Sequence, residues 1–116
     1  MNALILCTEV TLKLLFLSFA EALLANFPDD ISALTAAHKI LSGKAAFSDL
    51  PPGEKAQYHV VCSRMCYLLC NVAKAEEHGK KALEIYRSRR NAAGILQCEK
   101  MLDFYRKLQN LNSGKF

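Results

Sequence analysis

The chain has 116 residues, 52% of them hydrophobic and 22% charged, so it can form one domain with a packed core, and wholesale disorder is excluded. Its net charge of +4 is uneven, because residues 1–58 carry four basic and six acidic side chains, whereas residues 59–116 carry eleven and five. The second half therefore suits an acidic partner, although a solvated helix face is the simpler interpretation of the same charges.

The first half predicts two helices. Apolar residues occupy nearly every face of about residues 8–26, which predicts a helix buried on several sides. Pro28 ends it, because proline disfavours helical backbone at the preceding residue. Asp29 or Asp30 can cap a second, amphipathic helix that runs as far as Gly43.

The second half predicts three helices, which follow a strong break at the Leu-Pro-Pro-Gly segment, residues 50–53. Apolar residues recur at intervals of three and four over about residues 54–70, 72–87 and 92–110. Only two or three residues separate the first two of these helices, so they must form an antiparallel hairpin. Strand patterns are absent from the sequence, so we expect an all-α fold of about five helices.

Small residues mark the middle of this second half. Ser63 lies inside one predicted helix, Ala75 and Ala82 stand seven apart in the next, and a turn is expected near Cys70-Asn71. With these residues, segment 56–87 resembles a single tetratricopeptide repeat, a helix-turn-helix unit of about 34 residues. Small side chains at such positions let neighbouring helices approach closely.

The resemblance implies a right-handed array of helical hairpins that binds other proteins, and a small helical bundle is the alternative. Gly79 stands where the family prefers an aromatic residue, and Arg87 replaces its usual terminal proline. We expect a single domain over residues 1–111 and a disordered tail over residues 112–116. The abrupt start within an apolar segment is compatible with a piece of a longer repeat protein.

No catalytic, metal or cofactor site is predicted. Three cysteines share one helix face, and His59 lies one turn before the first of them: Cys62, Cys66 and Cys70. One straight helix cannot wrap a metal ion, so a zinc site would need Cys98 or His78 to close it. We expect reduced core cysteines in a cytoplasmic protein. Phosphate-binding glycine loops and nucleophile elbows are also absent from the sequence, so we expect no enzyme and no small-molecule substrate.

Basic residues form the first candidate partner-binding site. Its residues are Lys80, Lys81, Arg87, Arg89 and Arg90. They could hold an acidic peptide segment, or a nucleic acid as the alternative. Nucleic acid is the less favoured partner, because Tyr86 and Tyr105 lie on faces that we assign to packing rather than to base stacking.

The apolar first helix is the second candidate contact, through Leu14, Leu15, Leu17 and Phe19. A helix that is apolar on all sides at the end of a small array has too few neighbours to cover it. A partner protein, a second copy of the chain or further repeats could dock there. A secreted or membrane-attached helical protein is the alternative, but Glu9 and the short apolar run, below the ~20 residues of a membrane span, argue against it.

We therefore expect a non-catalytic adaptor or scaffold module in the cytoplasm. It would bind a partner peptide or helix through a groove similar to that of the tetratricopeptide repeat, with basic side chains steering an acidic partner.

Overall fold

The structure is a computed structural model that describes residues 2–43, 47 and 50–112, with side chains from Leu12 to Leu111 within those ranges. It contains helices α1 (Asn2–Asn26), α2 (Ile31–Leu41), α4 (Pro52–Leu68), α5 (Val72–Ser88) and α6 (Ala92–Asn112). No strand occurs among these described residues, so the predicted all-α fold is confirmed.

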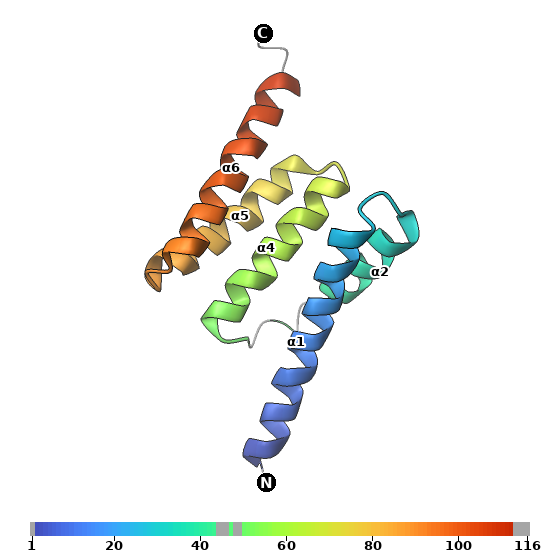
Figure 1. The fold of residues 1–116 in the computed structure, drawn as a ribbon, viewed down its shortest axis with the longest axis vertical. Helices are drawn as coiled ribbons and strands as arrows, with labels where there is room; N and C mark the ends of the chain where they lie inside the picture. The colour runs from blue at the N-terminus through green and yellow to red at the C-terminus, as the bar shows by residue number, and fades with distance from the viewer. Residues whose placement is uncertain (1, 44–46, 48–49, 113–116) are drawn as a thin grey trace.

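Helices that are neighbours in the chain are packed side by side (Figure 1). α1 packs on α2, α4 on α5, and α5 on α6, while α1 and α2 also contact α4. The molecule is elongated, with extents of 61 × 36 × 22 Å. The amino-terminal part of α1 and the carboxy-terminal part of α6 extend beyond the other helices at opposite ends of the molecule (Figure 1).

The core consists of two hydrophobic clusters that meet at α4. The first cluster joins α1, α2 and α4, and includes Val61 and Cys62. The second joins α4, α5 and α6, and includes Val60 and Cys66. α4 is therefore the central helix, because its successive residues face two different cores.

The α4–α5 and α5–α6 connections have the same conformation. Cys70 and Arg90 adopt left-handed backbone, with φ of 65° and 55°. The backbone N–H of the next residue donates to a carbonyl five residues earlier, at 2.8 Å for Asn71 and 3.0 Å for Asn91, which closes each helix as a Schellman motif. The side-chain oxygens of both asparagines then accept the backbone N–H three residues later, at 3.1 and 3.0 Å. One asparagine thus ends one helix and begins the next.

Two glycines allow α5 and α6 to approach closely. A Cβ atom on Gly94 would lie 2.5 Å from the ring of Tyr86, and one on Gly79 would lie 2.9 Å from a methyl group of Leu102. Gly79 stands where the tetratricopeptide repeat prefers an aromatic residue, and here the side chain of Leu102 from α6 fills the space.

The helix boundaries differ from the prediction at several ends, including one end each of α1, α4 and α6. α1 begins at Asn2 rather than near residue 8, because nothing in its first turns breaks a helix. α4 begins at Pro52, since proline suits the first helical position. α6 continues to Asn112, which was predicted to belong to the tail. The rest of that predicted tail lies outside the described residues.

Candidate functional site

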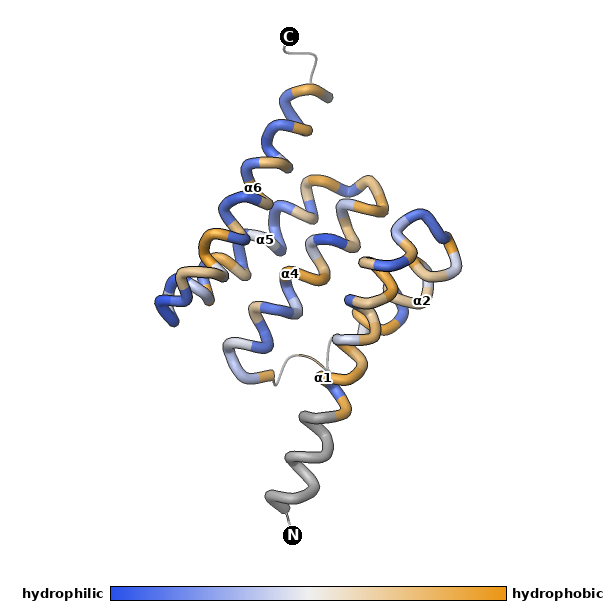
Figure 2. Tube along the Cα trace, viewed as in Figure 1, coloured by the Kyte–Doolittle hydropathy of each residue, from blue (hydrophilic) through white to orange (hydrophobic). Residues whose placement is uncertain are grey.

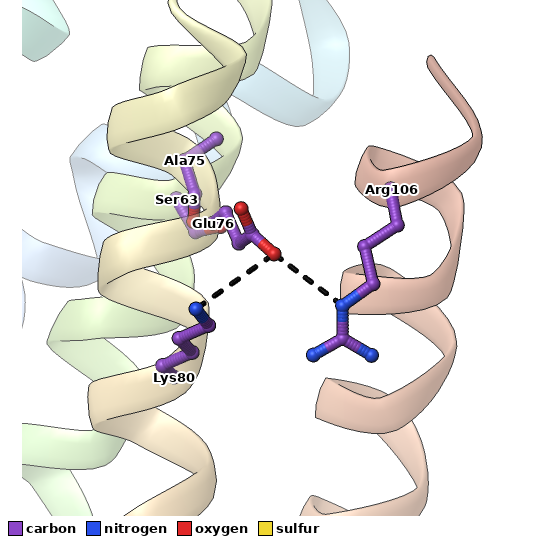
Figure 3. Close-up of polar contacts among 5 residues, drawn as sticks. All are labelled: Ser63, Ala75, Glu76, Lys80 and Arg106. Atoms are coloured by element: carbon purple, nitrogen blue, oxygen red, sulfur yellow. Dashed lines mark hydrogen bonds and ion pairs between the residues drawn. The ribbon is translucent and has the colours of Figure 1, made fainter. Parts of the chain in front are cut away.

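The five basic residues predicted as one binding site lie on different surfaces. Lys80 and Arg87 line a groove between α5 and α6. There Arg87 pairs with Glu99 at 3.4 Å, while Lys80 lies 3.9 Å from Glu76. Figure 3 shows the Glu76 carboxylate between Lys80 and Arg106 of α6. The distance from Nε of Arg106 to Oε2 of Glu76 is 3.4 Å. Their charges are thus shared with carboxylates of the chain itself.

The other three residues point elsewhere. The guanidinium of Arg89 lies close to Gly53, at the start of α4. Arg90 occupies the left-handed position of the α5–α6 connection and is exposed. Lys81 follows Lys80 on an adjoining face of α5 and lines a second groove. The basic segment is therefore not one continuous patch.

This second groove, which we call the lysine–histidine groove, follows α4 and α5 and reaches α2 at one end. Three adjoining hollows form it, one of them about 360 Å³ in volume. Basic side chains on its walls and apolar side chains on its floor line it, including Lys55, Lys74, Lys81, His38, His59, His78, Leu41, Phe47, Tyr58, Cys62, Met65, Leu69 and Ile85. Glu77 and Glu84 are the acidic residues that line it.

Two histidines that line this groove are in direct contact. Nδ1 of His59 on α4 lies 3.0 Å from Nδ1 of His78 on α5, so one ring donates and the other accepts. Burial, together with the smaller effects of His78, Lys81 and Lys55, lowers the pKa of His59 to about 4. Burial also lowers the pKa of His78, with a further contribution from Lys81. Both imidazoles are therefore neutral at pH 7.

The lysines of the groove carry unneutralised charge. Within the described residues, Lys55, Lys74 and Lys81 form no ion pair with a carboxylate, although Glu77 lies in the same groove. The α5–α6 groove differs, because its Lys80, Arg87 and Arg106 are paired. The lining of the lysine–histidine groove thus carries three lysines against two glutamates, a net charge of +1.

The floor of the groove is fixed by buried contacts. The hydroxyl of Tyr58 donates to the carbonyl oxygen of Leu41 at 3.1 Å, and its ring stacks on Phe47 with the centroids 4.9 Å apart. Burial raises the pKa of the Cys62 thiol to about 12, so this cysteine is a neutral, apolar part of the floor. Among the described residues no group of three or more His, Cys, Asp or Glu could hold a metal ion.

The apolar residues of α1 divide between core and surface. Leu17 is buried in the first cluster, and Leu14 packs against it, so neither lies on an exposed face. Four side chains between 47% and 61% exposed form what we call the α1 stripe: Leu12, Leu15, Phe16 and Phe19. Figure 2 shows that this part of α1 is predominantly hydrophobic.

Sequence reasoning found Leu15 and Phe19 but missed Leu12 and Phe16, because a helix that is apolar on all sides does not reveal which face is covered. It also missed the lysine–histidine groove. The available signal was spacing: Lys74, His78 and Lys81 stand four and three apart on one face of α5.

Comparison with known proteins identifies no relative. No family model, curated protein or solved structure matches the chain. In the described part of the chain, no helix is both long enough and apolar enough to cross a membrane.

Proposed function

We propose that this protein is a non-catalytic interaction module, an adaptor or scaffold, that docks another polypeptide on the α1 stripe. The observation that carries this proposal is the exposure of Leu12, Leu15, Phe16 and Phe19 on the part of α1 whose Leu17 is buried in the first cluster. Their positions are i, i+3, i+4 and i+7, which is the spacing of a helix that inserts into a partner's groove.

Covering the α1 stripe with a partner is energetically favourable, because the stripe is apolar. Removing a large apolar side chain from water contributes on the order of 1.5–3 kcal/mol. Contiguous exposed patches of this kind are uncommon on monomers and mark interaction sites. Because the four side chains are 47% to 61% exposed, covering them would contribute roughly half of that amount each toward the entropy cost of association.

The architecture supports a helical-repeat construction. Consecutive antiparallel helices are joined twice by the same turn, with left-handed Cys70 and Arg90 at equivalent positions. Small side chains, Ser63, Ala75 and Ala82, are completely buried where helices meet. These features fit the resemblance of residues 56–87 to a tetratricopeptide repeat. The free thiols of the described cysteines fit a reducing compartment such as the cytoplasm.

Quantitative capture from a lysate tests this function. The tagged chain is compared with the double variant Leu15→Glu, Phe16→Glu and with a control, Leu96→Glu, which alters an equally exposed leucine on α6. We expect the double variant to lose a set of proteins that the wild type and the control retain. Identical capture by all three proteins would contradict a role for the α1 stripe. Sedimentation of the purified chain measures whether it forms a homodimer, and so distinguishes a second copy of the chain from a different partner protein.

A further inference from the structure

The lysine–histidine groove has a feature that the fold itself does not require. Three lysines line it without a carboxylate partner among the described residues, and two of them act on His59 electrostatically. Like charges gathered around a concave surface repel one another, and a bound anion relieves that repulsion. The other charged groove, between α5 and α6, neutralises its own charges.

Antiparallel packing of α4 and α5 creates this arrangement. Lys55 and His59 stand one turn apart on α4, and His78 and Lys81 stand one turn apart on α5. The two helices run in opposite directions, so the 3.0 Å contact of the histidines brings both lysines to the same end of the pair. Lys74 lies one turn beyond His78, near the other end.

We propose that the lysine–histidine groove binds an acidic segment of a partner polypeptide, with Lys55, Lys74 and Lys81 contacting its carboxylates while apolar side chains of the segment rest on the floor. This inference deepens the interaction function and rests on it, but it concerns a surface separate from the α1 stripe.

A polypeptide fits this groove better than a nucleic acid does. The floor is apolar, with the buried side chains of Leu41, Cys62 and Met65, which suits side chains rather than a sugar–phosphate backbone. Tyr58 is stacked on Phe47, so neither ring is free for a base.

The histidine pair links binding to protons. When one of the two histidines is protonated, its Nδ1–H donates to the unprotonated Nδ1 of the other, so the contact is kept. When both are protonated, both Nδ1 atoms are donors and the contact is lost. Carboxylates in the groove favour the protonated form, so the pair takes up a proton as the segment binds. The charged and titratable groups around it are Lys55, Tyr58 and Cys62 of α4, Lys74, Glu77, Lys81 and Glu84 of α5, and His38 of α2.

The length of the groove sets the size of the probe. From Lys55 to Leu69, α4 rises about 21 Å at 1.5 Å per residue. An extended peptide covers that length in about six or seven residues. A suitable probe is a fluorescein-labelled peptide of about eight residues that combines Glu and Asp with Leu. The control is a charge-reversed peptide in which Lys replaces each acidic residue.

Fluorescence anisotropy with the purified chain tests the proposal. Lys74→Glu with Lys81→Glu should weaken binding of the acidic peptide more than about tenfold. The control Lys39→Glu with Lys100→Glu makes the same change in net charge outside the groove, and should weaken it less than about threefold. Equal losses in the two double variants would overturn the groove as the binding site.

Proton linkage is tested with the same probe. Binding should be about threefold tighter at pH 6 than at pH 7.5, and His59→Gln with His78→Gln should abolish that difference. Equal affinity of the wild type at both pH values would overturn the role given to the histidine pair.

A single-stranded oligonucleotide with the same number of charges as the acidic peptide tests whether the groove prefers a nucleic acid. If it binds more tightly than the acidic peptide, and the groove variants remove that binding, the ligand is a nucleic acid and the proposal is wrong. Leu15→Glu with Phe16→Glu should leave peptide binding unchanged. A failure of the groove is therefore distinct from a failure of the α1 stripe.

Discussion

Ser63 of α4 and Tyr105 of α6 form a hydrogen bond of 3.0 Å between their hydroxyl groups, inside the second cluster. Ser63 donates its single proton to the carbonyl oxygen of Ala75 in α5, at 2.7 Å, so the hydroxyl of Tyr105 must be the donor. One buried serine thus connects all three carboxy-terminal helices.

Replacing Tyr105 with phenylalanine should lower the free energy of unfolding by about 1 kcal/mol, because one buried hydrogen bond is lost while Ser63 keeps its bond to Ala75. Urea denaturation followed by circular dichroism measures the change. Tyr67→Phe is the matched control, since the Tyr67 ring packs against Tyr105 without this bond. An equal loss in the control would show that the hydroxyl of Tyr105 contributes nothing specific.

The two glycines between α5 and α6 should respond differently to alanine. Gly94→Ala should lower the free energy of unfolding by about 1–3 kcal/mol, because its Cβ would overlap the base of the Tyr86 ring at 2.5 Å. Gly79→Ala should change it by less than about 1 kcal/mol. Its Cβ meets a methyl group at the end of the Leu102 side chain rather than a rigid ring, and alanine gains helix propensity. Thermal denaturation of both variants checks this order, which the reverse ranking would contradict.

Glycine at the left-handed position of either connection should stabilise the protein. Cys70→Gly and Arg90→Gly should each raise the free energy of unfolding by about 0.5–1 kcal/mol, since glycine adopts positive φ without steric cost. Cys70→Ala and Arg90→Ala retain the Cβ atom and serve as controls. Urea midpoints measure all four variants, and a gain in the alanine variants as large as in the glycine variants would refute this explanation.

The described cysteines should differ widely in reactivity. Cys70 is exposed, whereas Cys62, Cys66 and Cys98 are buried and burial raises the pKa of each thiol. With iodoacetamide at about pH 8, Cys70 should be alkylated on the order of a hundredfold faster than these three. Peptide mass spectrometry resolves the sites, and urea-unfolded protein should show similar rates for all four. Rapid labelling of Cys62 in the folded protein would contradict the packing of α4.

Acid should destabilise the fold through the histidine pair. The pKa of His59 is 6.5 when unfolded and about 4 when folded, so the unfolded chain binds more protons between these values. The free energy of unfolding should therefore fall by about 1–2 kcal/mol as pH drops from 6.5 to 4, after allowance for the partial exposure of the ring. Urea titrations at several pH values measure this slope. His59→Gln with His78→Gln should flatten it, and His38→Gln should not.

Most of the architecture could be predicted from sequence, because it depends on local signals. Apolar spacing placed five helices, and Pro28 and the Leu-Pro-Pro-Gly segment marked the breaks between them. The Schellman turns were harder, since Cys70 and Arg90 stand where glycine is the usual signal. Asparagine at the following position was the remaining indication of a turn.

The surfaces could be predicted far less well, because they depend on how helices pair. Lys80 and Lys81 are adjacent in sequence, yet one faces α6 and the other faces His59 of α4. The contact between His59 and His78 requires the register of the hairpin, which the spacing of apolar residues does not specify. Periodicity assigns a residue to a face of its helix, and only the packing decides what that face meets.

Packing between neighbours in the chain has a consequence for how the molecule acquires its structure. The most extensive helix contacts are those of α4 with α5, α5 with α6 and α1 with α2, so most of the loops that must close during folding are short. We expect folding to begin in the α4–α5 hairpin and to spread outward, with α6 joining from one side and the α1–α2 pair from the other. The same order in reverse would make the two ends of the molecule the first to open under force or denaturant, while the central hairpin opens last.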